Sequence, residues 1–367
     1  LFYKNRSLSV LEITLLSSLI PIFSFILEIP IGYFADKYGR KFSLLIGNLF
    51  LVAYGIIYFF ANSFFMFAVG MSFFAIAMAF FSGSDVALIY DSLKKVKKEK
   101  LASKYFGWYN SAGNFAPLFF APVAALIARD LTNFQFDILL SINLLGYLIG
   151  IILTFFIVEP KFRHKGVRKG TIASFKDSFK LLLTNKNLIN LGVNLYLLSP
   201  LIILWWAYFA QLYYTKLGIN VVYFGFLASA ATFFSIIIRT NTHRLEKYFG
   251  EINLLYLSSI IPMIAFILMV FIKNIWISLI LVFVIAIASV RKTVFSTYIN
   301  HNLESHNRAT VLSAMAMIAA PFTIIIQIVL GYIADIGFNY LLLFMALWLF
   351  IITFVFRIKK EHITVKV

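Results

Sequence analysis

The dominant pattern in the chain is a series of long apolar stretches separated by short polar segments. A helix of about 17–25 apolar residues is long enough to cross the hydrocarbon core of a bilayer. By this measure the predicted spans are 10–34, 42–61, 64–90, 105–128, 135–158, 188–213, 219–239, 252–272, 275–298, 310–334 and 338–356. The pattern therefore predicts an all-α membrane protein with eleven spans.

The composition agrees with this prediction and excludes several kinds of chemistry. Hydrophobic residues make up 62% of the 367 residues and charged residues 13%, whereas soluble domains carry about 25% charged residues. The chain has no cysteine, which excludes disulfides, thiolate metal sites and cysteine nucleophiles. It also lacks a Gly-x-x-x-x-Gly-Lys-(Ser/Thr) segment, so ATP is not the direct energy source. We expect no cofactor and no metal site.

Basic residues are concentrated in alternate polar segments. All but five of the 32 Lys and Arg lie in 36–41, 91–104, 159–187, 239–251, 291–309 and 357–367. Because cytoplasmic loops carry the excess of Lys and Arg, we expect a multi-pass protein of the cell membrane with a cytoplasmic central loop and C-terminus. The basic run 94–100 is interpreted as a topology anchor near anionic lipid, and we expect no nucleic-acid partner.

The long polar segment 159–187 divides the chain. We predict an N-terminal half at 1–158 with five spans, a basic linker at 159–187 containing an amphipathic helix, and a C-terminal half at 188–367 with six spans. The first six residues are typical of the outer end of a preceding helix. We therefore expect that the first transmembrane helix is missing from this sequence.

The turn at 36–41 places a glycine and several charges directly between two apolar stretches. The residues concerned are Gly32, Asp36, Lys37, Gly39, Arg40 and Lys41. Charges so close to hydrocarbon are costly and mark function. Gly32 allows another helix to approach closely, and Asp36 lies on the same helix face. An acid there can meet the positive N-terminal end of a neighbouring helix, and Arg40 can bridge to an acid, for which Asp91 is our candidate.

Two other segments resemble this turn. Glu246-Lys247-Tyr248-Phe249-Gly250 repeats an acid, a cation, an aromatic residue and a glycine between two spans of the second half. Gly331-Tyr332-Ile333-Ala334-Asp335 matches Gly32 to Asp36 more closely in letters. Since it lies at the outer end of its span, we interpret this second match as coincidence or structural reuse.

The turn resembles the signature of the major facilitator superfamily, Gly-x-x-x-Asp-(Arg/Lys)-x-Gly-Arg-(Arg/Lys), at every fixed position. The resemblance implies a twelve-helix fold of two pseudo-symmetric six-helix halves, with eleven spans present here. It also implies that Asp36 meets the start of the family's eleventh helix, near Arg308. The turn and Asp91 would then form a conformational latch between the halves at the inner face. Two features depart from proton-coupled members: 65–80 contains no Arg, and the antiporter element of the fifth helix is degraded to Gly113, Pro117 and Pro122.

Polar residues at membrane depth are candidates for coupling or substrate binding. Glu28 and Asp85 are each a candidate proton site, a contact to a cationic substrate, or half of a structural ion pair. Arg291 binds an anionic substrate or extends toward the cytoplasm, and we favour the second interpretation. Amphipathic side chains can also line a cavity for bulky organic molecules; these candidates are Asn110, Asn114, Asn194 and Trp205.

The function predicted from these features and the resemblance is secondary active transport of a small organic solute by alternating access. Proton-coupled efflux is our hypothesis, and the expected partners are the solute, protons and the lipid bilayer, with the protein a monomer. The alternatives are an importer of a sugar, amino acid or metabolite, a non-transporting membrane protein, and a membrane-embedded enzyme. The sequence shows no His-Asp pair and no serine nucleophile elbow, so we expect no enzyme.

Overall fold

The structure is a computed structural model that describes residues 1–98, 101–160, 184, 186–301 and 308–359. All secondary-structure elements in these ranges are helices, as predicted. The amphipathic helix expected in the linker falls on residues outside the described part.

The first half of the chain forms seven helices in its described residues. They are α1 (Phe2–Asn5), α2 (Val10–Tyr38), α3 (Arg40–Phe60), α4 (Phe64–Phe81), α5 (Ser84–Lys95), α6 (Ala102–Ile127) and α7 (Asn133–Phe156). The described residues of the second half form α9 (Lys186–Leu204), the π-helix η2 (Trp205–Phe209), α10 (Ala210–Lys216), α11 (Val222–Thr240), α12 (Thr242–Phe249), α13 (Glu251–Phe271), α14 (Ile275–His301), α15 (Arg308–Ile336), α16 (Phe338–Phe350) and the π-helix η3 (Ile351–Val355).

The helices are long enough to cross a membrane. Within the described residues, ten helical stretches meet the length and hydropathy expected of a span, and the shorter apolar helix Ile275–Arg291 coincides with the remaining predicted one. This agrees with the eleven predicted spans. A helix satisfies its own backbone hydrogen bonds, which is why apolar segments take this form in lipid.

Local sequence signals explain where several helices begin. Ser9 and Glu12 form a capping box at the start of α2, and Thr132 and Gln135 form another at the start of α7. Such boxes satisfy backbone N–H groups that have no partner inside the helix. Gly83 adopts a left-handed conformation with φ of 73° and separates α4 from α5. One predicted span, 64–90, is therefore made of two helices.

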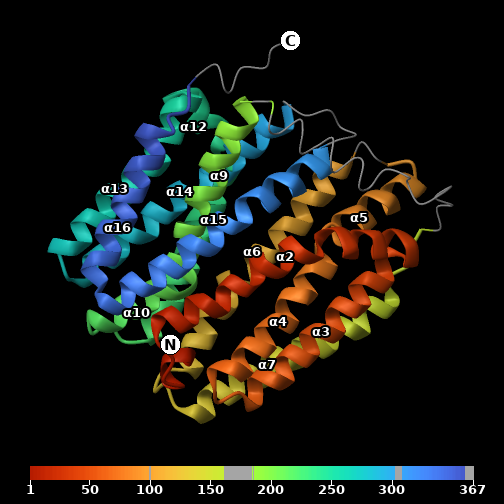
Figure 1. Cartoon of the computed structure of the whole chain (residues 1–367), viewed down its shortest axis with the longest axis horizontal. Coiled ribbons are helices and arrows are strands. Elements are labelled where there is room, and N and C mark those ends of the chain that lie inside the picture. The colour runs from red at the N-terminus through yellow and green to blue at the C-terminus, as the bar shows by residue number, and fades with distance from the viewer. Residues whose placement is uncertain (99–100, 161–183, 185, 302–307, 360–367) are drawn as a thin grey trace.

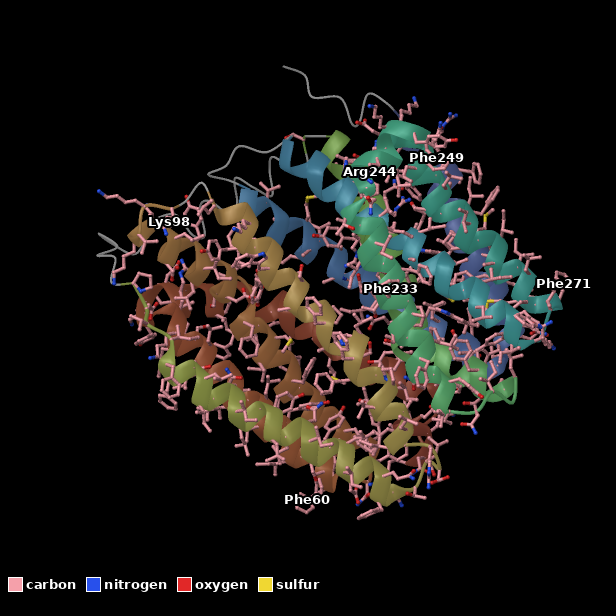
Figure 2. All side chains as sticks on the ribbon, turned by 180° about the vertical axis from the view of Figure 1, so that it is seen from behind. Phe60, Lys98, Phe233, Arg244, Phe249 and Phe271 are labelled. Atoms are coloured by element: carbon pink, nitrogen blue, oxygen red, sulfur yellow. The ribbon has the colours of Figure 1, made fainter. Side chains whose placement is uncertain are left out.

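The helices form two groups that meet along two contacts. Figure 1 shows the helices up to α7 on one side of the molecule and those from α9 onward on the other, with α2 and α15 side by side between them. The second contact joins α6 and α11. Figure 2 shows Lys98 of the first half and Arg244 of the second at the same end of the bundle. We call this the basic end and the other the opposite end.

Large apolar side chains cover much of the outer surface. Figure 2 shows Phe60 and Phe271 projecting outward from the bundle, and both are largely exposed. The helices α6 and α7 bury few of their residues within the protein. Because lipid is the solvent for such a surface, exposed Phe, Leu and Ile are expected there.

Candidate functional site

A large cavity lies between the two groups of helices. Its volume is about 1390 Å³, and side chains from both halves line it. The polar and aromatic lining residues include Ser17, Ser24, Glu28, Tyr54, Phe74, Tyr196, Trp206, Tyr208, Thr232, Arg239, Thr323 and Gln327. A mainly apolar cavity with a few polar groups is the usual form of a small-molecule site.

Contacts between the halves close this cavity at the opposite end. Ser17 on α2 donates a hydrogen bond to Gln327 on α15 over 3.3 Å. Ser229 on α11 donates to the backbone oxygen of Leu118 on α6. Both hydrogen bonds lie on the side of the cavity away from the basic end. The cavity extends from there toward the basic end.

Glu28 is the one predicted acid that the structure places at the cavity. It projects from α2, and no other acid in the described part of the chain is among the lining residues. Asp85 instead lies at the start of α5, where it accepts hydrogen bonds from the Tyr109 hydroxyl and from the backbone N–H of Val86. The two candidate acids therefore have different environments.

The other predicted cavity residues have mixed outcomes. Trp205 is 0% exposed and packs against Phe266 at a ring-centroid distance of 5.2 Å, so it does not line the cavity, whereas its neighbours Trp206 and Tyr208 do. All three lie in the π-helix η2, where i→i+5 hydrogen bonds replace the i→i+4 bonds of an α-helix and change the directions of successive side chains. Asn110 and Asn114 lie on α6, and their side chains are outside the described part.

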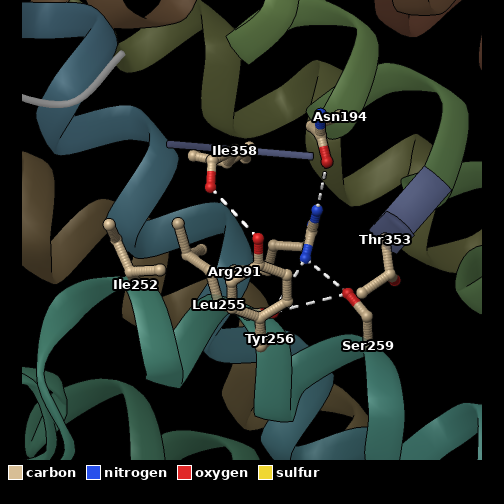
Figure 3. A pocket seen from close by; sticks show the side chains of 8 residues that line it. All are labelled: Asn194, Ile252, Leu255, Tyr256, Ser259, Arg291, Thr353 and Ile358. Carbon is tan, nitrogen blue, oxygen red and sulfur yellow. Dashed lines mark hydrogen bonds between the residues drawn. The ribbon is translucent and has the colours of Figure 1, made fainter. Parts of the chain in front are cut away.

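Arg291 is buried, so our interpretation that it extends toward the cytoplasm is wrong. Its side chain is 4% exposed, and it donates hydrogen bonds to Asn194 Oδ1 at 2.8 Å, Ser259 Oγ at 2.6 Å and the Leu255 oxygen at 3.0 Å. Figure 3 shows the guanidinium among these side chains of α9 and α13. Asn194 in turn donates to the backbone oxygen of Phe356 at 2.8 Å. Since these contacts join α9, α13 and α14 with the end of the last helix, Arg291 and Asn194 hold the second half together.

The residues of the predicted latch gather at the basic end. Arg40 Nε lies 3.2 Å from Asp91 Oδ2, and a guanidinium nitrogen of Arg40 lies 3.6 Å from Asp36 Oδ1. The ion pair between Arg40 and Asp91 expected from the sequence is therefore present. Lys41 donates from Nζ to the backbone oxygen of Phe155 at 2.7 Å. Lys37 lies over the ring of the adjacent Tyr38 at 5.0 Å.

These contacts remain inside the first half. The ion pairs join α2, α3 and α5, and none of the described contacts of this cluster reaches the second half. A Cβ placed on Gly32 meets nothing within 4 Å. The close approach of another helix at Gly32 is thus not made in this conformation, because the halves are apart at the basic end.

Glu159 is a functional candidate that the sequence did not reveal. Its carboxylate accepts hydrogen bonds from the backbone N–H groups of Arg40 and, at 3.3 Å, Lys41. It thereby caps the N-terminus of α3, where backbone donors are unsatisfied and a negative charge is favoured. The only sequence signal was an acid directly after an apolar span that ends at the same side of the membrane as Gly39.

Comparison with known protein families agrees with this geometry. Residues 1–320 match the model of the Major Facilitator Superfamily. The chain belongs to this superfamily. Among curated protein sequences, none matches the chain. Membership in this superfamily makes it a secondary transporter of small solutes and not an enzyme.

Solved structures of other transporters have a similar fold. A point mutant of the nucleoside transporter NupG superposes with a TM-score of 0.80 at 15% identity, covering 96% of this chain and 91% of that one. A POT family transporter in complex with 5-aminolevulinic acid has a TM-score of 0.74 at 13% identity, covering 98% and 90%. A bacterial homolog of the human lysosomal transporter Spinster, inward-facing and unoccupied, has a TM-score of 0.73 at 15% identity, covering 95% and 89%.

Within the described ranges, no group of three or more His, Asp or Glu side chains is placed to hold a metal ion. The described lining of the cavity offers one carboxylate, the guanidinium groups of Arg239 and Arg291, several hydroxyls and aromatic faces. These groups can bind a small organic molecule and exchange a proton with it or with water.

Proposed function

We propose that this transporter exports a small organic solute by alternating access and couples export to proton entry, with its basic end in the cytoplasm. The observation that carries this proposal is Glu28, the only described acid at a cavity that both halves line. An ionisable residue facing a cavity at membrane depth is suited to binding and releasing a proton. The concentration of Lys and Arg at one end supports its cytoplasmic orientation, so that this conformation opens inward.

The chemistry of the cavity supports a solute with an apolar or aromatic body. Aromatic residues from both halves, including Tyr54, Phe74, Trp206 and Tyr208, line it together with serine and threonine hydroxyls. Nucleosides, amino-acid-like zwitterions and lipophilic cations are three classes of compound that such a lining can contact. The structurally similar transporters include a nucleoside transporter and one with bound 5-aminolevulinic acid.

The experiment begins with a ligand screen and continues with flux. Purified protein is heated with uridine, 5-aminolevulinic acid or tetraphenylphosphonium, and the compound that raises the unfolding temperature is then followed in reconstituted vesicles with and without a pH gradient. When the side opposite the basic end is the acidic one, we expect the gradient to drive the solute from the basic side to the opposite side. Movement that ignores the gradient would overturn the coupling, and gradient-driven movement toward the basic side would show import.

A matched pair of variants tests the role of Glu28. Glu28→Gln removes the carboxylate at the cavity and should abolish the stimulation by the pH gradient while retaining solute binding. Asp85→Asn removes an acid of the same half that does not line the cavity, so its stimulation should be near that of the native protein. Full gradient dependence in Glu28→Gln would exclude Glu28 as the coupling site.

A further inference from the structure

The segment Gly331-Tyr332-Ile333-Ala334-Asp335 has the same glycine-to-aspartate spacing as Gly32 to Asp36, and the two segments lie on helices that pack against each other. We propose that Gly331 and Asp335 form an outer clasp that closes the cavity at the opposite end, as the counterpart of the latch predicted at the basic end. This inference rests on the alternating access proposed above. Of the two interpretations of the sequence match, coincidence or structural reuse, it adopts the second.

Asp335 provides the first part of the outer clasp. Its Oδ1 accepts a hydrogen bond from the backbone N–H of Val10 at 2.9 Å, and its Oδ2 accepts one from that of Leu11 at 2.7 Å. These are the first two N–H groups of α2. One carboxylate from the second half thus binds the N-terminus of a helix of the first half, where the helix dipole favours negative charge.

The capping box at the start of α2 does not reach all of the backbone donors there. Ser9 Oγ accepts from the N–H of Glu12 at 3.1 Å, and Glu12 Oε2 accepts from the N–H of Ser9 at 2.7 Å. This capping box leaves the N–H groups of Val10 and Leu11 without an intrahelical acceptor. Asp335 satisfies both, so cap and closure are the same interaction.

Gly331 provides the second part by permitting close approach. A Cβ at this position would overlap Thr14 Oγ1 and would lie 3.0 Å from Leu11 Cα. Only a glycine lets the two helix backbones come this close. Gln327, Gly331 and Asp335 are spaced four residues apart and share one face of α15, and the hydrogen bond from Ser17 to Gln327 continues the contact toward the cavity.

The two ends of the pair formed by α2 and α15 are in opposite states. At Gly331 the helices touch, whereas a Cβ on Gly32 would meet nothing within 4 Å. The helices are antiparallel, so the Gly-x-x-x-Asp end of each faces the N-terminal end of the other. Such a pair has the parts for one closure at each end, and a cavity that opens to one side at a time requires that the closures alternate.

The absence of cysteine from the chain allows a direct test of the outer clasp. Spin labels on Arg129→Cys and Lys273→Cys, which are exposed residues of the two halves at the opposite end, report the distance across that end in the purified protein. In Asp335→Ala, the ratio of long to short distances should rise about fivefold, as expected for the loss of a helix cap. In Gly331→Val, the long distances should dominate.

Glu12→Gln is the matched control, because it weakens the same helix start from within the first half. It should leave the distance distribution unchanged. An unchanged distribution in folded Asp335→Ala would overturn the outer clasp, as would an equal shift in Glu12→Gln. The readout needs no solute, so a shift with no detectable transport would leave the clasp standing while the proposed function failed. Transport without a shift would do the reverse.

Discussion

The turns at Gly39 and Gly250 have the same backbone and different chemistry. Gly39 lies between α2 and α3 with φ of 103° and ψ of 152°, and Gly250 lies between α12 and α13 with φ of 78° and ψ of 146°. Each donates its N–H to the helix before it, to Ala35 at 3.0 Å and to Glu246 at 2.9 Å. The copy of the turn noticed in the second half therefore repeats a backbone conformation that essentially only glycine adopts.

The charges around the two glycines are opposite in kind. Arg40 follows Gly39 and meets Asp36 and Asp91. Glu251 follows Gly250, and it repels Glu246 one turn earlier. Since the second turn forms without ion pairs among its described residues, the charges at the first turn are not needed to make the bend. The latch predicted from the sequence remains the role that we propose for them.

The largest expected difference between the turns comes from adding a methyl group to each glycine. In Gly39→Ala, the unfavourable backbone costs about 1–3 kcal/mol, and the Cβ would lie 2.7 Å from Glu159 Oε2, displacing the cap of α3. In Gly250→Ala the backbone cost remains, but the nearest atom to the Cβ is 3.9 Å away. In detergent, the unfolding temperature should fall further for Gly39→Ala than for Gly250→Ala. An equal fall in unfolding temperature for the two variants would mean that the cap formed by Glu159 contributes little to stability.

A smaller effect is expected from the acids next to the turns. Glu159→Gln weakens a charged cap on two backbone N–H groups, which should cost about 1 kcal/mol. Glu251→Gln removes a charge in the first turn of α13 that caps nothing and repels Glu246, so its unfolding temperature should be unchanged or slightly higher. The comparison uses the same thermal measurement. A larger loss in Glu251→Gln would reverse the assignment of roles.

The smallest effect concerns pH. Partial burial, followed by repulsion from Glu251, raises the pKa of Glu246 above its ordinary value of 4.5. The folded protein therefore binds this proton more tightly than the unfolded chain, and stability falls as pH rises from 4.5 through the raised pKa. Glu246→Gln should reduce this fall in a series of unfolding temperatures.

Asp130 provides the opposite sign as a control. Hydrogen bonds from Gln135 and Arg129 lower the pKa of Asp130, so its contribution is present above the ordinary value and is lost as pH falls through the lowered pKa. Asp130→Asn should therefore alter the series only at the acidic limit. If Asp130→Asn changed the unfolding temperatures in the pH range where Glu246 titrates, the two groups would not be independent.

The sequence alone was sufficient to predict the spans, the superfamily and the contact between Arg40 and Asp91. Apolar stretches in lipid must satisfy their backbone hydrogen bonds internally, so hydropathy determines the helices. The signature determined the family because its glycines and charges have fixed spacing within one turn. Glu28 could also be identified from the sequence, because a carboxylate inside an apolar stretch lies at membrane depth.

Other features depended on the tertiary structure. Glu159 caps α3 from 119 residues away along the chain, Arg291 turns into the packed helices, and a π-helix places Trp206 rather than Trp205 at the cavity. The close contact between Gly331 and Thr14 likewise forms only where the two halves pack against each other. Hydropathy reports how deep a residue lies in the membrane, but the direction of its side chain around the helix axis, and the helix that it meets, are decided by packing between distant segments.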